Sequence, residues 1–327
     1  MRQFDGMPPF RTVLKTAGAV ICLALCVRIG YYAMTDGFSL ARVEAPLSFP
    51  GDFSVPPPSG STLKILSSLS QQHFRYFKKG SQAYAFLSED GQYVLKLFKL
   101  HHLQQANWLR ALPAFGFLKT YRDFLIERRD YRIDLTLNSY KLAAEQLPDE
   151  CALIYAQILP SPAYSLPVTI HDAVGRTYTI DLAQHGFAVQ RRCDLVIPCF
   201  ERWIRDHDME KGRAAIDSLV ALIARRSSKG IQDIDPDLHK NAGLLNGHAI
   251  FIDIGSFRAC PEMRQTHEMK STVKKVFLHF SEWLADRSFE LNEHLAQRLE
   301  TPGSVCWSSP STPRFDDQEV SVVGQHP

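Results

Sequence analysis

The stretch Ile231–Phe257, IQDIDPDLHKNAGLLNGHAIFIDIGSF, decides how this chain is interpreted. Its acids cluster just before Asn241, an Asn-Gly turn follows, and an apolar run then ends in Asp253-Ile-Gly. These residue types fit a magnesium site for a phosphate ligand, because Mg²⁺ binds carboxylate and carbonyl oxygens together with phosphate oxygens. The alternative is an ordinary hairpin, since acids and Asn-Gly beside an apolar strand are also common turn residues.

The rest of the chain places this stretch in a helical half that follows a strand-rich half. Alternating apolar residues and turn signals predict strands over the following segments: Arg75–Leu87 (two strands around a small-residue turn), Gln92–Lys99, Ala152–Leu159, Val168–Ile180 (a hairpin) and Phe187–Gln190. Apolar residues spaced three and four apart predict helices over these segments: Gln104–Gln146, Phe200–His207, Met209–Arg226 and most of Glu262–Glu300. The order indicates a two-lobed α+β protein that holds a ligand between its lobes.

The N-terminus carries a separate signal. Arg2, Arg11 and Lys15 precede an apolar run that Arg28 interrupts before the apolar character resumes as far as Met34. The uninterrupted part is shorter than the roughly 20 residues of a membrane span and resembles the core of a signal peptide. We favour a single-pass membrane anchor, because no small-residue cleavage site follows. The positive-inside rule would place the bulk of the chain outside, but later basic residues weaken this bias and leave the side of the membrane open.

These features divide the chain into four parts. Residues 1–45 form a tail with the anchor or signal, and residues 46–65, rich in Pro, Gly and Ser, are expected to be a linker. The folded domain is expected over 66–300, with an N-lobe at 66–190 and a C-lobe at 191–300. The Pro- and Ser-rich tail 301–327 is predicted to be disordered.

Composition excludes several classes of function. The net charge is +2 and basic residues are scattered among acids, so nucleic acid is not expected as a partner. The seven cysteines show no paired CxxC spacing, which argues against a zinc site. A disulfide framework is not expected in a chain this long and this poor in cysteine, so the thiols are predicted to be reduced.

Two motifs in the strand-rich half carry phosphate-binding chemistry. Lys79-Gly-Ser-Gln-Ala places Gly80 and Ser81 in a small-residue turn, where backbone N–H groups can meet phosphate oxygens. Lys96 follows in a strand, and its apolar neighbours are expected to fill the opposite face. Each motif has a plain structural alternative, a simple hairpin for the first and a solvent-facing lysine for the second.

Together, the motifs resemble a divergent protein-kinase-like domain of the aminoglycoside phosphotransferase type over about residues 66–290. The resemblance implies ATP and Mg²⁺ as cofactors, with Gly80, Ser81 and Lys96 on the phosphates. It also implies a helix glutamate that pairs with the lysine, for which Glu145 is the first candidate and Glu127 the second. Phe187–Arg192 would be the segment that joins the two lobes and offers backbone groups to the adenine.

The segment Asp237-Leu-His-Lys-Asn241 resembles the catalytic loop of this family. Asn241 and Asp253 would bind the metal, and Asp237 would be the catalytic base. The spacing departs from the family pattern, since Asp237 lies one residue too close to Asn241 and Asp235 one residue too far. We take Asp237 as the first candidate for the base and Asp235 as the second.

The resemblance implies a membrane-anchored enzyme that transfers the γ-phosphoryl group of ATP to a hydroxyl group of a protein or small molecule. Because the catalytic loop is irregular, a catalytically inactive pseudokinase that serves as an interaction module at the membrane is the first alternative. An exported protein in which the Ile231–Phe257 hairpin is only structural is the second. No segment after Asp253 resembles the peptide-substrate platform of protein kinases.

Overall fold

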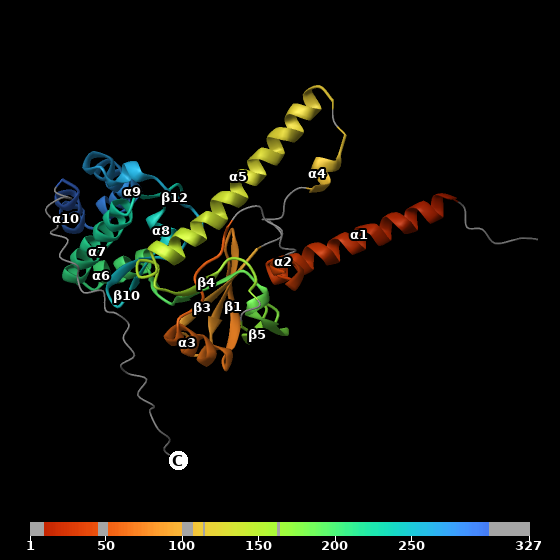
Figure 1. Cartoon of the computed structure of the whole chain (residues 1–327), viewed down its shortest axis with the longest axis horizontal. Helices are drawn as coiled ribbons and strands as arrows, with labels where there is room; N and C mark the ends of the chain where they lie inside the picture. The colour runs from red at the N-terminus through yellow and green to blue at the C-terminus, as the bar shows by residue number, and fades with distance from the viewer. Residues whose placement is uncertain (1–9, 45–51, 100–106, 114, 162–163, 301–327) are drawn as a thin grey trace, which may run out of the picture. The chain divides into compact units, whose positions relative to one another are not determined.

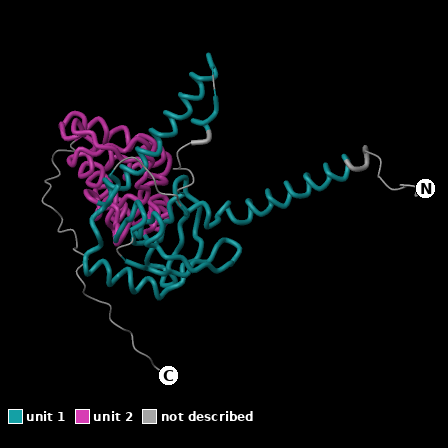
Figure 2. The backbone as a smooth tube through the Cα atoms, turned by 45° about the vertical axis from the view of Figure 1, so that its right-hand side comes forward, with its two compact units in different colours: residues 1–144, 154–192 teal, residues 145–153, 193–327 magenta. Residues whose placement is uncertain are grey.

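A computed structural model describes residues 10–44, 52–99, 107–113, 115–161 and 164–300. The tail 301–327, which the sequence predicts to be disordered, lies outside these residues, as does part of the predicted linker. The chain is a mixed α/β protein with one large sheet, and it divides into two compact units (Figure 1, Figure 2). Unit 1 comprises residues 1–144 and 154–192, and unit 2 comprises residues 145–153 and 193–327.

Unit 1 is built on a seven-stranded sheet of order β4-β7-β3-β2-β1-β5-β6. Its strands are β1 (His73–Lys79), β2 (Ala83–Ser88), β3 (Tyr93–Phe98), β4 (Leu153–Gln157), β5 (Pro167–His171), β6 (Thr177–Asp181) and β7 (Phe187–Arg191). Strands β1 and β5 run parallel, and β1–β2, β2–β3, β3–β7 and β5–β6 are antiparallel. Most of these strands match the predicted ones, since apolar alternation and turn residues mark them in the sequence.

Three helical segments precede the sheet: α1 (Phe10–Thr35), α2 (Leu40–Val43) and α3 (Gly60–Ser70). Within α1, the 22 residues Leu14–Thr35 are long and apolar enough to cross a membrane, a property that anchors and signal sequences share. Helix α3 begins inside the predicted linker 46–65, so that prediction is too long at its C-terminal end. The reason is local, because the Ser59 side chain accepts a 3.2 Å hydrogen bond from the Thr62 amide and caps the helix.

The segment that follows α1 is part of the folded unit. Phe38 and Val43 are buried in the apolar core of unit 1. The Phe38 ring packs edge-on against Tyr84 and Phe86 of β2, at centroid distances of 5.2 and 5.3 Å. The Tyr84 hydroxyl donates a 2.8 Å hydrogen bond to the carbonyl of Gly37. The end of α1 is therefore joined to unit 1 by packing as well as by the chain.

The helix predicted over Gln104–Gln146 is divided in the structure. Its first residues lie outside the described part of the chain, and the remainder forms α4 (Asn107–Ala111) and α5 (Phe117–Gln146). Pro113 and Gly116 separate the two helices, and Gly116 has a positive φ of 56°. The Tyr140 ring of α5 stacks on Phe98 at a centroid distance of 4.0 Å, which packs the C-terminal part of α5 on β3.

Unit 2 is mostly helical. It contains α6 (Val196–Arg205), α7 (Met209–Ser228), α8 (Leu238–Asn241), α9 (Thr266–Ala285), α10 (Phe289–Glu300) and a short 3₁₀ turn, η3 (Pro261–Arg264). Its strands are β8 (Asp194–Leu195), β9 (Ile231–Asp233), β10 (Ala242–Leu245), β11 (His248–Phe251) and β12 (Phe257–Ala259). Strand β10 pairs with both β11 and β8, and β12 pairs with β9. A core of buried aromatic and aliphatic side chains from α6, α7, α9 and α10 holds the helices together.

Residues 145–153 group with unit 2, although the sequence places them in the N-lobe. Glu150 is the physical reason. Its buried carboxylate forms ion pairs with Arg225 (3.2 Å) and Lys229 (2.8 Å), both in the last turn of α7 or just beyond it. Its backbone carbonyl accepts a 2.8 Å hydrogen bond from the Phe251 amide. These long-range contacts tie the segment to unit 2 and have no signal in the local sequence.

Candidate functional site

The Ile231–Phe257 stretch forms two pairs of strands in unit 2. Strands β10 and β11 are joined by Asn246 and Gly247, whose positive φ angles of 50° and 82° are those of a tight hairpin turn. Ala242 pairs with Phe251, and the amide of Ile252 donates a 2.9 Å hydrogen bond to the Asn241 carbonyl. At the open end of this hairpin, Asn241 directly precedes β10 and lies opposite Ile252, the residue before Asp253.

Strand β9 and the residues after Asp253 form the second pair. In the ladder between β9 and β12, Asp233 lies opposite Phe257. The Asp233 carboxylate accepts hydrogen bonds from the Ser256 hydroxyl (2.6 Å) and from the Asp235 amide (3.1 Å). Asp233 thus joins the loop after β9 to the Asp253-Ile-Gly segment.

Asp233 is buried and forms a 3.0 Å ion pair with Arg226 of α7, whose side chain is also buried. The guanidinium carbon lies 5.0 Å from the centroid of the Phe251 ring and 5.8 Å from that of Phe257. Burial raises the pKa of Asp233, and the charge of Arg226 opposes this shift. We infer that Asp233 is a structural residue that fixes the loop, because its carboxylate is occupied by groups of the protein.

Asn241 and Asp235 are linked directly. The side-chain amide of Asn241 donates a 2.9 Å hydrogen bond to the backbone carbonyl of Asp235. Because the amide nitrogen is used in this way, the Oδ1 atom of Asn241 remains available as a ligand. In the described part of the chain, the exposed carboxylate of Asp235 makes no hydrogen bond or ion pair.

Asp237 has a different environment. Its side chain caps α8 by accepting a 3.0 Å hydrogen bond from the His239 amide, and it forms a 3.0 Å ion pair with Lys240. Burial raises the pKa of Asp237, but the hydrogen bonds with Lys240 and with the His239 amide outweigh it, so the pKa lies below its usual range. A helix cap that is also ion-paired is poorly suited to accept a proton.

Asp253 follows β11 and is half-buried. Its carboxylate accepts a 3.1 Å hydrogen bond from the Gly255 amide, which fixes the turn into Ile254-Gly255. Among the described residues, no cluster of three or more His, Cys, Asp or Glu side chains is arranged to hold a metal. Asn241 and Asp253 still fit Mg²⁺, which proteins usually bind through one or two carboxylates while phosphates and water complete the octahedron.

The remaining predicted residues lie mainly in unit 1. Lys96 is in the middle of β3, paired with Ala85 on one side and Ala188 on the other. Its neighbours Leu95 and Leu97 are fully buried, as the sequence predicts, whereas Lys96 is half-buried. Strand β3 therefore presents Lys96 on the face opposite these leucines.

Gly80 and Ser81 lie in the exposed turn between β1 and β2. The turn is closed by a 2.9 Å hydrogen bond from the Gly80 amide to the Ala83 carbonyl. Gln82 in this turn is held by the protein, because its side chain accepts a 3.0 Å hydrogen bond from the Tyr140 hydroxyl and its backbone carbonyl accepts one of 2.8 Å from the Lys99 amide. The turn is a compact hairpin with a single glycine.

Lys99, one residue after β3, is a residue that the sequence analysis missed. It is almost fully buried, its ammonium group donates to the carbonyl of Gly80, and it lies 4.5 Å from the centroid of the Tyr84 ring. Burial, together with the charge of Lys79, lowers the pKa of Lys99 to about 8. Strand alternation was the available signal, since Lys99 follows Leu95 and Leu97 on the buried face.

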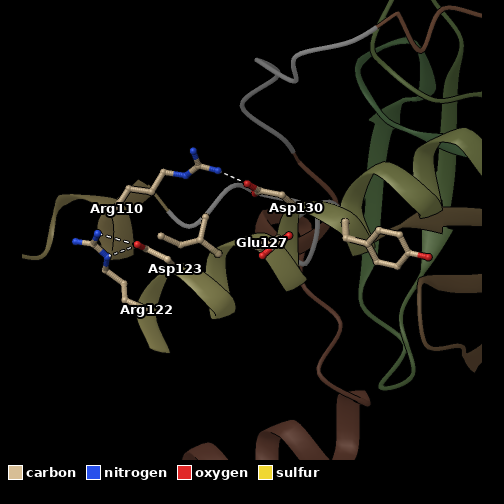
Figure 3. Close-up of a pocket in the computed structure, with 7 residues that line it drawn as sticks. Arg110, Arg122, Asp123, Glu127 and Asp130 are labelled. Atoms are coloured by element: carbon tan, nitrogen blue, oxygen red, sulfur yellow. Dashed lines mark hydrogen bonds and ion pairs between the residues drawn. The ribbon is translucent and has the colours of Figure 1, made fainter. Parts of the chain in front are cut away.

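The two glutamates predicted to pair with Lys96 lie in different units of the chain. Glu145 is exposed at the end of α5 and belongs to unit 2. Glu127 is exposed in the N-terminal half of α5 and lines a pocket between α4 and α5 (Figure 3). Four charged groups of this pocket form ion pairs, Arg110 with Asp130 and Arg122 with Asp123, and neither pair includes Glu127. The pocket therefore lies where the Arg110–Asp130 ion pair holds α4 and α5 together. The pairing of Lys96 with Glu145 or Glu127 stays a prediction.

Comparisons with known proteins give weak similarity to kinase-containing structures. No family model matches the sequence, and no curated protein matches it. Among solved structures, the bifunctional kinase-methyltransferase WbdD is similar at 16–18% identity with TM-scores of 0.29–0.31, over 68–70% of this chain and 42–45% of that one. The Rv3197–erythromycin complex from Mycobacterium tuberculosis is similar at 16% identity and a TM-score of 0.31, over 75% of this chain and 67% of that one.

This chain spans less than half the length of the WbdD chains that it matches. TM-scores near 0.3 do not define the fold of this chain beyond a mixed α/β class. The residues of unit 2 and the sequence motifs are therefore the basis for a functional assignment, and these structural similarities are not.

Proposed function

We propose that this protein is a membrane-anchored, kinase-like phosphotransferase that uses Mg²⁺ and ATP to phosphorylate a hydroxyl group. The observation that carries the proposal is the hydrogen bond from the Asn241 side chain to the Asp235 backbone carbonyl, together with the hydrogen bond from the Ile252 amide to the Asn241 carbonyl, one residue before Asp253. An acid, an amide oxygen and a second acid thus belong to one loop system, in which the Asp235 carboxylate is exposed. This is the set of groups that phosphoryl transfer requires.

In this proposal Asp235 is the catalytic base, in preference to Asp237. Asp235 has an exposed carboxylate without a protein partner in the described part of the chain, whereas Asp237 caps α8 and pairs with Lys240. Asp235 would accept the hydrogen bond of the attacking hydroxyl and orient its oxygen. Asp237 would keep α8, and with it Asn241, in place.

Asn241 and Asp253 would hold magnesium through their side-chain oxygens. When bound, the ion neutralises charge on the phosphate oxygens. The hydrogen bonds that restrain both residues favour this role, because oxygen ligands that are already oriented lose little freedom on binding. Lys96 of unit 1 remains the proposed phosphate-binding lysine, and Gly80 and Ser81 remain the proposed phosphate loop.

The anchor is part of the proposal. Helix α1 has the length and composition of a membrane span, and the segment directly after it packs into unit 1 through Phe38. Reporter fusions placed after residue 60 would decide on which side of the membrane the rest of the chain lies. An outward-facing domain in a compartment without ATP would contradict phosphotransfer.

ATP turnover separates an enzyme from a pseudokinase. Purified full-length protein is assayed for Mg²⁺-dependent ADP release, alone and with an added hydroxyl acceptor, and compared with Asp253→Asn. The surface variant Asp206→Asn, in the same unit, is the matched control. We expect turnover in the wild type and the control and only the background rate in Asp253→Asn. Equal rates in all three proteins would establish that the chain is not an enzyme of this kind.

A further inference from the structure

The connection between α4 and α5 exposes an unusual number of large apolar side chains. We define the apolar tip as the following residues, with their exposed fractions: Leu112 (48%), Phe115 (84%), Phe117 (80%), Leu118 (54%), Tyr121 (60%) and Phe124 (53%). Exposed apolar residues are common singly, but six within 13 consecutive residues favour a binding surface. Four of the six are aromatic.

The tip is held in a defined shape. Arg110 of α4 forms an ion pair with Asp130 of α5 (Figure 3). Arg122 donates a 2.7 Å hydrogen bond to the carbonyl of Leu112. Arg122 also pairs with Asp123 at 2.8 Å. These contacts hold α4 against the N-terminal half of α5, while the aromatic side chains of the tip stay exposed.

The charge around the tip is positive. Between residues 107 and 132 the sequence contains six basic residues (Arg110, Lys119, Arg122, Arg128, Arg129 and Arg132) and three acids (Asp123, Glu127 and Asp130). Arg110, Lys119 and Arg122 form ion pairs with Asp130 or Asp123, whereas Arg128 and Arg132 are exposed on α5 and form no ion pair in the described part of the chain. Aromatic side chains mixed with Lys and Arg are typical of segments at the interface of a bilayer with anionic lipids.

The end of α1 favours a bilayer over a soluble protein as the partner. Tyr31 and Tyr32 in its last turns contact cations of unit 1, with Arg176 donating to the Tyr31 hydroxyl at 2.8 Å and Lys79 to that of Tyr32 at 3.1 Å. Tyrosines beside Lys and Arg at the end of an apolar helix are the usual composition of a membrane–water interface. Unit 1, which carries the apolar tip, is thus joined without a free linker to the helix proposed as the anchor.

We propose that the apolar tip inserts into the surface of an anionic lipid bilayer and gives unit 1 a membrane contact separate from α1. The aromatic rings would lie among the headgroups and upper acyl chains, and the exposed cations Arg128 and Arg132 of α5 would face the lipid phosphates. The inference does not depend on phosphoryl transfer. It would explain why the connection between α4 and α5 exposes four aromatic rings.

Lipid photolabelling tests the proposal. The full chain is reconstituted in vesicles of phosphatidylcholine and about 30% phosphatidylserine, in keeping with an anionic leaflet, with a trace of phosphatidylcholine that carries a diazirine on an acyl chain. After irradiation, labelled peptides are identified by mass spectrometry. We expect label on residues 112–124 well above that on the peptide containing Phe289, an aromatic residue of unit 2 that is equally exposed at 80%.

The variant Phe115→Ser/Phe117→Ser should lose most of the label on this hairpin, while label on α1 and thermal stability stay unchanged, because both rings are exposed. Omitting phosphatidylserine should also lower the hairpin label. Label confined to α1, or hairpin label that is unaffected in the double variant, would overturn the proposal. Amine cross-links between copies at Lys119 without lipid label would make the tip a contact between copies and would also overturn it. Label on the hairpin without label on α1 would support the tip and contradict the anchor.

Discussion

The side-chain amide of Asn241 donates a 2.9 Å hydrogen bond to the backbone carbonyl of Asp235. This contact fixes the loop before α8 against the strand that starts at Ala242, and it orients the remaining oxygen of Asn241. It involves Asp235 and not Asp237, whereas the sequence spacing to Asn241 does not favour either aspartate clearly. The account of the site depends on it.

Substitution of Asn241 should separate its two roles. Asn241→Ala removes the proposed metal ligand and the hydrogen bond, so we expect a loss of about 1 kcal/mol in stability and a loss of about tenfold or more in Mg-ATP affinity. Asn241→Asp keeps an oxygen ligand but cannot donate to the Asp235 carbonyl. It should bind Mg-ATP and turn over slowly. Calorimetric titration with Mg-ATP and chemical unfolding measure both effects, and unchanged affinity in Asn241→Ala would contradict the metal role.

Removing one partner of the buried pair Arg226–Asp233 should destabilise unit 2 strongly, although the intact pair need not add net stability. Arg226→Met leaves the Asp233 carboxylate buried without its charge partner, which should lower the free energy of unfolding by about 3–5 kcal/mol. The double variant Arg226→Met/Asp233→Asn should recover part of this loss, because no uncompensated charge remains. Urea unfolding of the full-length protein in detergent provides the comparison. Recovery would not occur if the two side chains acted independently.

Phe38 should matter for folding although it lies only three residues beyond α1. Its ring packs on Tyr84 and Phe86, so Phe38→Ala should cost about 3–5 kcal/mol. Phe117→Ala is the matched control, because Phe117 is 80% exposed and its loss should change stability by less than about 0.5 kcal/mol. Thermal unfolding of both variants measures the two losses of stability relative to the wild type. Equal stability of the two would contradict the docking of the α1 end on unit 1.

Lys99 should make the stability of unit 1 depend on pH in the alkaline range. Its pKa is about 8 in the folded protein, whereas an unfolded lysine has a pKa of about 10.4. Between these values the unfolded chain binds the extra proton, so stability should rise with pH from about 8 to about 10.4. Lys99→Met should remove this rise and should be more stable than the wild type below pH 8. Parallel pH dependence in the two proteins would contradict a buried, partly neutral Lys99.

Much of the fold follows from local sequence patterns, and the site follows only in part. Strands β1 to β3 and the Asn246-Gly247 turn follow from alternation and turn residues. Helix α7 follows from apolar spacing, and the structure extends it only to Ser228. The hydrogen bond from Asn241 to Asp235 and the pairing of Glu150 with Lys229 have no such signal. These contacts form only when the tertiary structure brings the residues together, so local sequence patterns do not predict them.

The most direct test of the central claim compares Asp235→Asn with Asp237→Asn in Mg²⁺-dependent ADP release. If Asp235 is the base, its substitution should lower turnover by about 10²-fold or more while Mg-ATP still binds. Asp237→Asn loses the ion pair with Lys240 but keeps an oxygen that can cap α8, so it should retain most of the activity. Full activity in Asp235→Asn with its loss in Asp237→Asn would contradict the account.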